Sequence, residues 1–295
     1  MPTFAFEAIG TSWQIETPAE LVPDARQAVL DRVESFDASY SRFRADSLVT
    51  EISEHPGRHV FPPDALALFD LYDRLAAATS GAVDPLVGRE LELLGYDRRY
   101  SLTPVPAGER TATDARGRAA WISDVRREGR VVTTDRPVVI DVGAAGKGYL
   151  VDLVAEVLRS HAVPEYVVDA SGDLVHAAPA GAPALRVGLE HPLDPRKAIG
   201  VAEIANASLC ASASNRRAWG DGLHHVLDAR TGRPAREVIA TWVVAADTAL
   251  ADGLATALFF TGAHQLAKTF HFSYVRMYAD GRAERSRDFP GELFV

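Results

Sequence analysis

A stretch that could bind an anion lies at residues 141–150, DVGAAGKGYL. A strand-like apolar run, 138–140, leads into Asp141, and three glycines and Lys147 follow before helical spacing begins. Glycines let backbone N–H groups approach an anion, and a helix N-terminus favours negative charge. The spacing differs from that of a P-loop and from the dinucleotide fingerprint. The alternative is a tight strand-to-helix turn with a solvated lysine.

A second candidate is the helix-like segment DTALADGLATALFFTG at 247–262. Asp252 and Thr256 are four residues apart, so they share one helical face among Ala, Leu and Phe neighbours. A buried carboxylate needs a partner, and a carboxylate, a hydroxyl and a backbone carbonyl are oxygen ligands that suit Mg²⁺. In the alternative, Asp252 pairs with a distant arginine and Thr256 bonds back to its own helix.

The third candidate is LHHVLDARTGRPA at 223–235. His225 lies on a strand-like run beside Val226 and Leu227, ahead of a polar turn at 228–232. A histidine placed in this way could accept a proton from a hydroxyl nucleophile or hold a phosphate. The alternative is a core histidine that bonds a backbone carbonyl, followed by a solvated turn.

The helices and strands that must position these residues can also be predicted from the sequence. Together they indicate an α+β fold in which antiparallel strands are interrupted by helices. Apolar periodicity predicts helices at 21–40, 64–79, 147–161 and from 247 or 248 to 262, with Asp64 capping the second of them. Alternation and turn residues predict strands at 4–16, 121–142, 166–169, 185–189, 201–204, 242–246, 272–278 and 282–285.

Composition narrows the function classes. The 295 residues suffice for one large domain or two modest ones, and the stretch 104–118, rich in Pro, Gly, Thr and Ala, predicts an exposed loop or a subdomain boundary. A net charge of -9 argues against a nucleic-acid partner, and a single cysteine excludes an internal disulfide. The N-terminus lacks a signal-peptide pattern, and the most apolar region, 241–262, contains two aspartates. We therefore expect a cytoplasmic protein without a membrane span.

Taken together, these segments resemble one known family. The order DVGAAGKGYLVD, VVDASGDL, LHHVLDARTGRPA and ADGLATALFFTG is similar to that of the ApbE-type FAD:protein FMN transferases. FEAIGTSWQI resembles the opening strand of that family, and TSGAVDPLVGREL resembles its Gly-x-x-Asp-Pro segment. The resemblance covers about residues 4–262. It implies a T-fold-related α+β fold, with largely antiparallel sheets and packed helices. The chain would be a single domain over 1–295, or two subdomains that meet near 104–118.

The resemblance also implies a role for each matching residue. Asp141 and Lys147 match a flavin-contacting aspartate and lysine, and His225 matches the active-site histidine. A Mg²⁺ ion would be held by the backbone carbonyl of Ala144 and by the side chains of Asp252 and Thr256. The FAD pocket would also use the segments that contain Ile9, Gly10, Gly81, Asp84 and Ser212.

The implied reaction is a Mg²⁺-dependent phosphoryl transfer. A Thr or Ser hydroxyl of an acceptor protein attacks the phosphorus on the FMN side of FAD, AMP leaves, and FMN stays on the acceptor. Lys147 would stabilise the developing charge, and His225 would accept or position the hydroxyl proton. Three alternatives stay open: an FAD pyrophosphatase that gives FMN and AMP, a non-catalytic FAD-binding protein, and a nucleotide-triphosphate enzyme built on the Gly143 loop.

Three positions depart from the family pattern. Ser171-Gly172-Asp173 replaces the usual Gly-Gly-Asp, and the run 211–215, ASASN, replaces Thr-Ser-Gly-Asp-Tyr. Ile9 replaces a methionine near the start. Because the run 211–215 would lie near the flavin, the second departure bears on pocket shape and on the choice of acceptor.

Overall fold

The structure is a computed structural model that describes residues 1–106, 108 and 117–294. Its largest sheet has eight strands in the order β1-β2-β6-β7-β10-β15-β16-β17, and each neighbouring pair is antiparallel. The strands are β1 Thr3–Ala8, β2 Thr11–Glu16, β6 Tyr166–Asp169, β7 Asp173–Ala177, β10 Ser208–Ala213, β15 Val238–Ala245, β16 Ser273–Tyr278 and β17 Ala283–Arg285.

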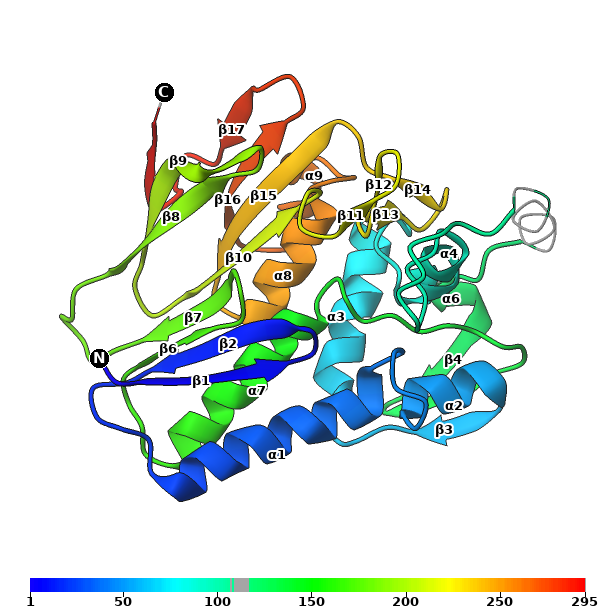
Figure 1. Cartoon of the computed structure of the whole chain (residues 1–295), viewed down its shortest axis with the longest axis horizontal. Helices are drawn as coiled ribbons and strands as arrows, with labels where there is room; N and C mark the ends of the chain where they lie inside the picture. The colour runs from blue at the N-terminus through cyan, green and yellow to red at the C-terminus, as the bar shows by residue number, and fades with distance from the viewer. Residues whose placement is uncertain (107, 109–116, 295) are drawn as a thin grey trace.

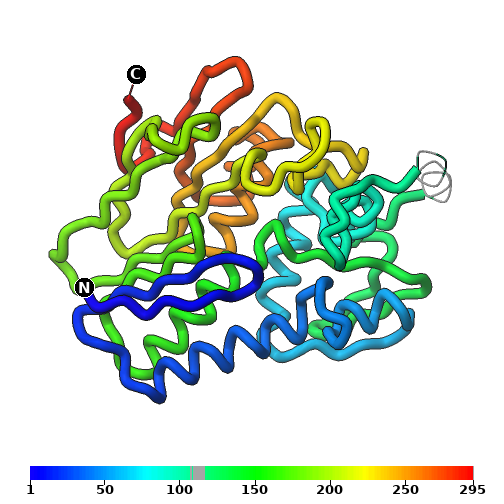
Figure 2. The backbone as a smooth tube through the Cα atoms, viewed as in Figure 1, coloured from blue at the N-terminus to red at the C-terminus, as the bar shows by residue number. Residues whose placement is uncertain are grey.

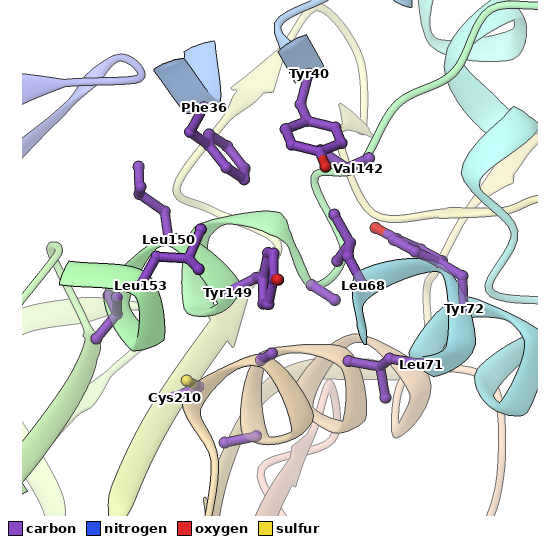
Figure 3. Close-up of a cluster of buried hydrophobic side chains, with 14 of the residues drawn as sticks. Phe36, Tyr40, Leu68, Leu71, Tyr72, Val142, Tyr149, Leu150, Leu153 and Cys210 are labelled. Carbon is purple, nitrogen blue, oxygen red and sulfur yellow. The ribbon is translucent and has the colours of Figure 1, made fainter. Parts of the chain in front are cut away.

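The longer helices pack together beside this sheet (Figure 1). They are α1 Pro23–Tyr40, α3 Ala65–Ala78, α7 Gly146–Ser160 and α8 Thr248–Ala257. Their apolar faces form the main core, in which Phe36 and Tyr40 of α1 lie near Tyr72 of α3 and Leu150 of α7 (Figure 3). The core therefore holds α7 and α8, which carry two of the candidate segments, in fixed positions.

A smaller sheet in the order β18-β9-β8 covers the part of the opposite face that is formed by β7, β10, β15 and β16. These strands are β8 Leu185–His191, β9 Asp194–Ile204 and β18 Gly291–Leu293. Alternate residues of a strand point to opposite faces, so Cys210 joins the helical core while its neighbour Leu209 joins the second core. The chain trace shows this layering, with the helices below and behind and the small sheet above (Figure 2).

The remaining elements are short. The short helices are α2 Leu48–Glu54, α4 Gly88–Leu93, α6 Trp121–Asp124 and α9 Ala263–Leu266, with the 3₁₀ turn η1 Pro85–Val87. A three-stranded sheet consists of β3 Arg58–Val60, β5 Val131–Thr134 and β4 Val125–Glu128. Two strand pairs are formed by β11 Ala218–Trp219 with β12 Leu223–His224, and by β13 Leu227–Asp228 with β14 Arg233–Pro234.

The predicted α+β class with largely antiparallel sheets is confirmed, and four details were wrong. Asp64 makes no capping hydrogen bond: its backbone, with φ of -70° and ψ of -19°, is already helical, and its carboxylate accepts from Arg32 Nη2 at 2.6 Å. The run 138–140 is not a strand, and the backbone N–H of Asp141 bonds Pro85 at 2.7 Å instead of a ladder partner. Residues 121–124 form a short helix, and α8 ends at Ala257, before turns that run on to 260.

Two further expectations concern the domain boundary and the membrane. Residues 107 and 109–116 of the expected subdomain boundary lie outside the described residues, so that boundary stays a prediction. Within the described ranges, no helix has both the length and the apolar character that a membrane crossing requires.

Candidate active site

The site is built where the first turn of α7 packs against α8. Gly148 lets the helices approach closely, because a Cβ at this position would lie 2.3 Å from the backbone oxygen of Thr248 and 2.7 Å from the Cβ of Asp252. The Gly148 N–H donates to Asp252 Oδ2 at 2.9 Å. One turn later, Asp152 accepts the N–H groups of Thr248 at 2.9 Å and Ala249 at 2.8 Å. These reciprocal bonds fix Asp252 at the α7 N-terminus, where the helix dipole favours a negative group.

The three oxygen donors expected to bind Mg²⁺ lie together. Asp252 and Thr256 are one turn apart on α8, and the Thr256 hydroxyl lies 3.4 Å from the carbonyl oxygen of Ala144, in the turn before α7. Among the described residues there is no cluster of three His, Cys, Asp or Glu side chains that could hold a metal. One carboxylate with two neutral oxygens is nevertheless a donor set that suits Mg²⁺ when substrate phosphates and water complete the shell.

Lys147 is engaged with protein groups. Its ammonium donates to the backbone oxygen of Ala170 at 2.8 Å and lies 2.7 Å from Asp173 Oδ2. Burial opposes the charge of Lys147, but Asp173 and Asp252 outweigh it and raise the pKa of the ammonium. Burial first, and Asp173 second, raise the pKa of Asp252 well above its ordinary value. Two buried carboxylates thus share one cation, and the raised pKa of Asp252 reflects a negative potential that a bound divalent ion would relieve.

Asp141 lies beside this cluster and is paired with an arginine. It accepts from Arg42 Nε at 2.6 Å and from the backbone N–H of Gly143 at 2.7 Å. Burial alone would raise the pKa of Asp141, but Arg42 outweighs it and holds that pKa below its ordinary value. Sequence reasoning missed Arg42, because the pair spans 99 residues and no local pattern marks it.

His225 lies between β12 and β13 and is neutral at physiological pH. Burial, and then the positive charge of Arg217, lower the pKa of His225 to about 3. Its Nδ1 is buried without a hydrogen-bond partner among the described residues. The adjacent His224 bonds a backbone carbonyl, that of Ala235, at 2.8 Å. The core-histidine alternative therefore describes His224, and His225 keeps a free nitrogen that could accept a proton.

This shift predicts how stability depends on pH. The unfolded chain binds a proton on His225 below about pH 6.5, whereas the folded chain does not until the pH falls to about 3. The free energy of unfolding therefore has its full value above about pH 6.5 and decreases as the pH falls from 6.5 toward 3. We expect His225→Asn to remove a pH slope of up to about 1.4 kcal/mol per unit. Urea unfolding of both proteins from pH 7 to 4.5 measures this, with His161→Asn as a control on an exposed histidine. Parallel curves for wild type and His225→Asn would contradict the assignment.

The remaining predicted residues lie at two places. Ile9 and Gly10, with φ of 45° and 76°, form the β1–β2 turn. Ser171 Oγ, in the β6–β7 turn, donates to the Ser12 backbone at 2.8 Å, and β10, which carries Ser212, runs past the start of β7. These segments thus meet at one end of the large sheet, next to Lys147. Ser171 itself has φ of 55°, a conformation that favours glycine.

The other place is the segment after α3. Both carboxylate oxygens of Asp84 accept backbone N–H groups, from Leu86 and Trp121, each at 2.8 Å. Gly81 has φ of 83°, and its nearest neighbour is the Arg230 side chain, at 3.8 Å from an ideal Cβ. No hydrogen bond between described residues joins Asp84 to Lys147, Asp173 or Asp252, so a flavin contact by Asp84 stays a prediction.

Comparisons with known proteins show which family and which fold this chain resembles. The sequence pattern described as the ApbE family matches residues 9–275. The FAD:protein FMN transferase of Vibrio cholerae is 28% identical over 268 residues, 86% of this chain and 79% of that protein. That of Salmonella typhimurium is 27% identical, covering 87% and 77%. The ApbE protein of Thermotoga maritima has a TM-score of 0.85 at 25% identity over 99% of both chains. The flavin transferase ApbE of Vibrio cholerae has a TM-score of 0.82 at 23% identity, covering 98% of this chain and 97% of that chain. The expected ApbE-like fold is thereby confirmed.

Proposed function

Because this chain belongs to the ApbE family and is an enzyme, we propose that it transfers FMN from FAD to a Thr or Ser hydroxyl of an acceptor protein, releasing AMP. The observation that supports this most strongly is the meeting of Ala144, Asp252 and Thr256 at the N-terminus of α7, beside Lys147. Oxygen donors, a helix N-terminus and a buried cation are what a pyrophosphate substrate requires.

The proposed reaction exchanges the phosphoanhydride bond of FAD for a phosphoester bond on the acceptor. The acceptor hydroxyl oxygen forms a bond to the FMN phosphorus, and the bond from that phosphorus to the bridging oxygen breaks. The bridging oxygen and its electron pair leave with AMP. His225, whose Nδ1 has no hydrogen-bond partner among the described residues, would position the hydroxyl group or accept its proton at that nitrogen.

The chain's own residues orient the pyrophosphate and balance its charge. Asp252, Thr256 and the Ala144 carbonyl would hold Mg²⁺, which when bound supplies Lewis-acid stabilisation of phosphate oxygens. The Lys147 ammonium, held by Asp173 and Ala170, places a fixed positive charge beside that position. Such preorganised charge lowers the barrier because it needs no rearrangement as the transition state forms.

One assay tests the proposal. Purified protein is incubated with FAD and MgCl₂, with and without a flavin-acceptor domain, and AMP and acceptor mass are followed. We expect AMP together with an FMN-sized mass gain on the acceptor, and neither product when EDTA replaces MgCl₂.

The same assay separates the alternatives. AMP without acceptor modification would replace the proposal with an FAD pyrophosphatase. Bound FAD without AMP in either condition would leave a non-catalytic FAD-binding protein. ATP turnover in the absence of FAD would instead support a nucleotide-triphosphate enzyme.

A further inference from the structure

Arg42 is a buried arginine whose outer nitrogens have no protein partner. Its side chain is only 4% exposed, and its Nε donates to Asp141 Oδ2 at 2.6 Å. Both Nη1 and Nη2 are buried without hydrogen-bond partners among the described residues. An unsatisfied buried donor on a charged group destabilises the fold, because the group has lost its water without gaining a partner. A bound ligand that supplied two acceptors would remove this cost.

Further unsatisfied atoms lie around the same aspartate. The hydroxyl of Tyr72 and Nδ1 of His225 are also buried without partners among the described residues. The charge of Asp141 acts on Tyr72, on Tyr96 and on His225, which places all three near it. Because buried polar atoms are nearly always satisfied in proteins, such a concentration favours a binding position over a structural core.

Aromatic rings fix the plane of the Arg42 guanidinium. Its Cζ lies 4.2 Å from the ring centroid of Phe43 and 5.1 Å from that of Tyr96. The two rings lie edge to face at 5.5 Å, and Phe43 stacks on Tyr100 at 4.9 Å. A guanidinium confined by two rings and by its Nε bond to Asp141 presents its remaining N–H groups as a planar fork of donors.

The charge of this fork selects the kind of acceptor. Arg42 is paired with Asp141, whose pKa is held low by Arg42 first and also by Arg217, whereas the groups that suit a pyrophosphate, a lysine and three oxygen donors, lie at Lys147. A neutral pair with two parallel donors suits two adjacent neutral acceptors. The pyrimidine edge of a flavin offers a carbonyl oxygen next to a ring nitrogen. In adenine, the amino donor lies between N1 and N7, so neither of these acceptors has a second acceptor beside it on that edge.

We propose that Arg42 binds the pyrimidine edge of the isoalloxazine ring through Nη1 and Nη2, and so selects a flavin over other dinucleotide parts. This rests on the proposed function, because it takes FAD as the substrate. Asp141 then acts as a positioning residue, which holds Arg42 rather than the ring. The adenylate part of FAD is bound elsewhere.

The test measures the two halves of FAD separately. Riboflavin binding, followed by quenching of its fluorescence, and ADP binding, followed by calorimetry, are compared for wild type, Arg42→Gln and Arg42→Lys. We expect both variants to bind riboflavin at least about tenfold more weakly, since two charge-assisted hydrogen bonds are lost or distorted. ADP affinity should stay within about twofold. Arg42→Lys keeps a positive charge beside Asp141 but lacks the fork of donors. A loss of riboflavin affinity in this variant is therefore due to the lost fork and not to an unpaired Asp141.

A matched control is available on the adjoining helix. Arg32 of α1 forms an ion pair with Asp64 at 2.6 Å, and Arg32→Gln should leave the affinity for both probes unchanged.

The absorption spectrum gives a second measurement of the same contact. In the Arg42 variants, the absorption band of bound riboflavin should move toward that of free riboflavin.

Two results would overturn the inference. Equal loss of riboflavin and ADP affinity would mean that Arg42 only supports the fold, and loss of ADP affinity alone would place it on a phosphate. Wild type that binds riboflavin and FAD but produces no AMP would remove the proposed transferase, and the riboflavin comparison would still decide the role of Arg42.

Discussion

Replacing Asp252 with asparagine is expected to lower kcat/KM for FMN transfer by on the order of a thousandfold. Asparagine has almost the same shape and can still accept the Gly148 N–H, which Asp252 accepts at 2.9 Å. What it lacks is the charge that a divalent ion needs. The effect should therefore arise in the chemistry of the site and leave the packing of α7 on α8 intact.

Thermal unfolding separates these two effects. Burial raises the pKa of Asp252 well above its ordinary value, so the charged form destabilises the metal-free fold at neutral pH. We expect Asp252→Asn without metal to be at least as stable as wild type, and its melting temperature to be insensitive to MgCl₂. Wild type should be stabilised by MgCl₂, since ligands that bind the native state raise its stability.

The control lies on the same helix. Asp247, exposed at the start of α8 and without a capping hydrogen bond, should be replaceable by asparagine with wild-type transfer and a wild-type response to MgCl₂. If Asp252→Asn protein transferred FMN normally, or still gained stability from MgCl₂, the proposed metal site would be wrong.

The sequence predicted the parts of this site that depend on local spacing. Asp252 and Thr256 share a face because four residues make about one helical turn; Thr256 contacts the Ala144 carbonyl and Asp252 accepts the Gly148 N–H, and their binding of Mg²⁺ stays a prediction. The alternative for Thr256, a bond to its own helix, is replaced by this contact at 3.4 Å. Helical periodicity likewise located α1 and α7, because each buries one continuous apolar face.

Pairings between distant segments could not be predicted in this way. The Arg42–Asp141 and Lys147–Asp173 pairs depend on how α1, α7 and the large sheet come together, and no residue type or spacing records that. Asp64 has a residue type that favours helix caps, but the guanidinium of Arg32 competes for its carboxylate. The run 138–140 has strand-like residues, but it lies outside the described sheets. In each case a tertiary contact outweighs a local preference.

Two strands of the large sheet that sequence reasoning missed share a physical cause. β7 and β10 are buried on both faces, so they lack the alternation of apolar and polar residues that marks a half-buried strand. Small residues in the run 211–215 hid the second half of β10 as well. The register that pairs Cys210 with Asp173 is nevertheless what carries Ser212 toward the β6–β7 turn.

Replacing Gly148 with alanine is expected to destabilise the fold and remove most of the transferase activity together. In an isolated helix alanine is favoured over glycine by about 1 kcal/mol. Here the added Cβ would lie 2.3 Å from the Thr248 backbone oxygen, and backbone cannot rotate away as a flexible side chain can. Overpacking of this kind costs about 1–3 kcal/mol, occasionally more. We expect a net loss of up to about 2 kcal/mol in the free energy of unfolding, measured with urea.

The loss of activity follows from the same displacement. If α7 moves away from α8, the Gly148 N–H leaves Asp252, and the Asp152 carboxylate leaves the two N–H groups that it caps at the start of α8. Ala144, in the turn before α7, would move with it, and the oxygen donors would no longer meet. Gly188→Ala in β8 is the matched control, because the nearest atom to its ideal Cβ is the Cβ of Ala198 at 4.0 Å. A Gly148→Ala protein with wild-type unfolding and wild-type transfer would show that this helix contact does not hold the site together.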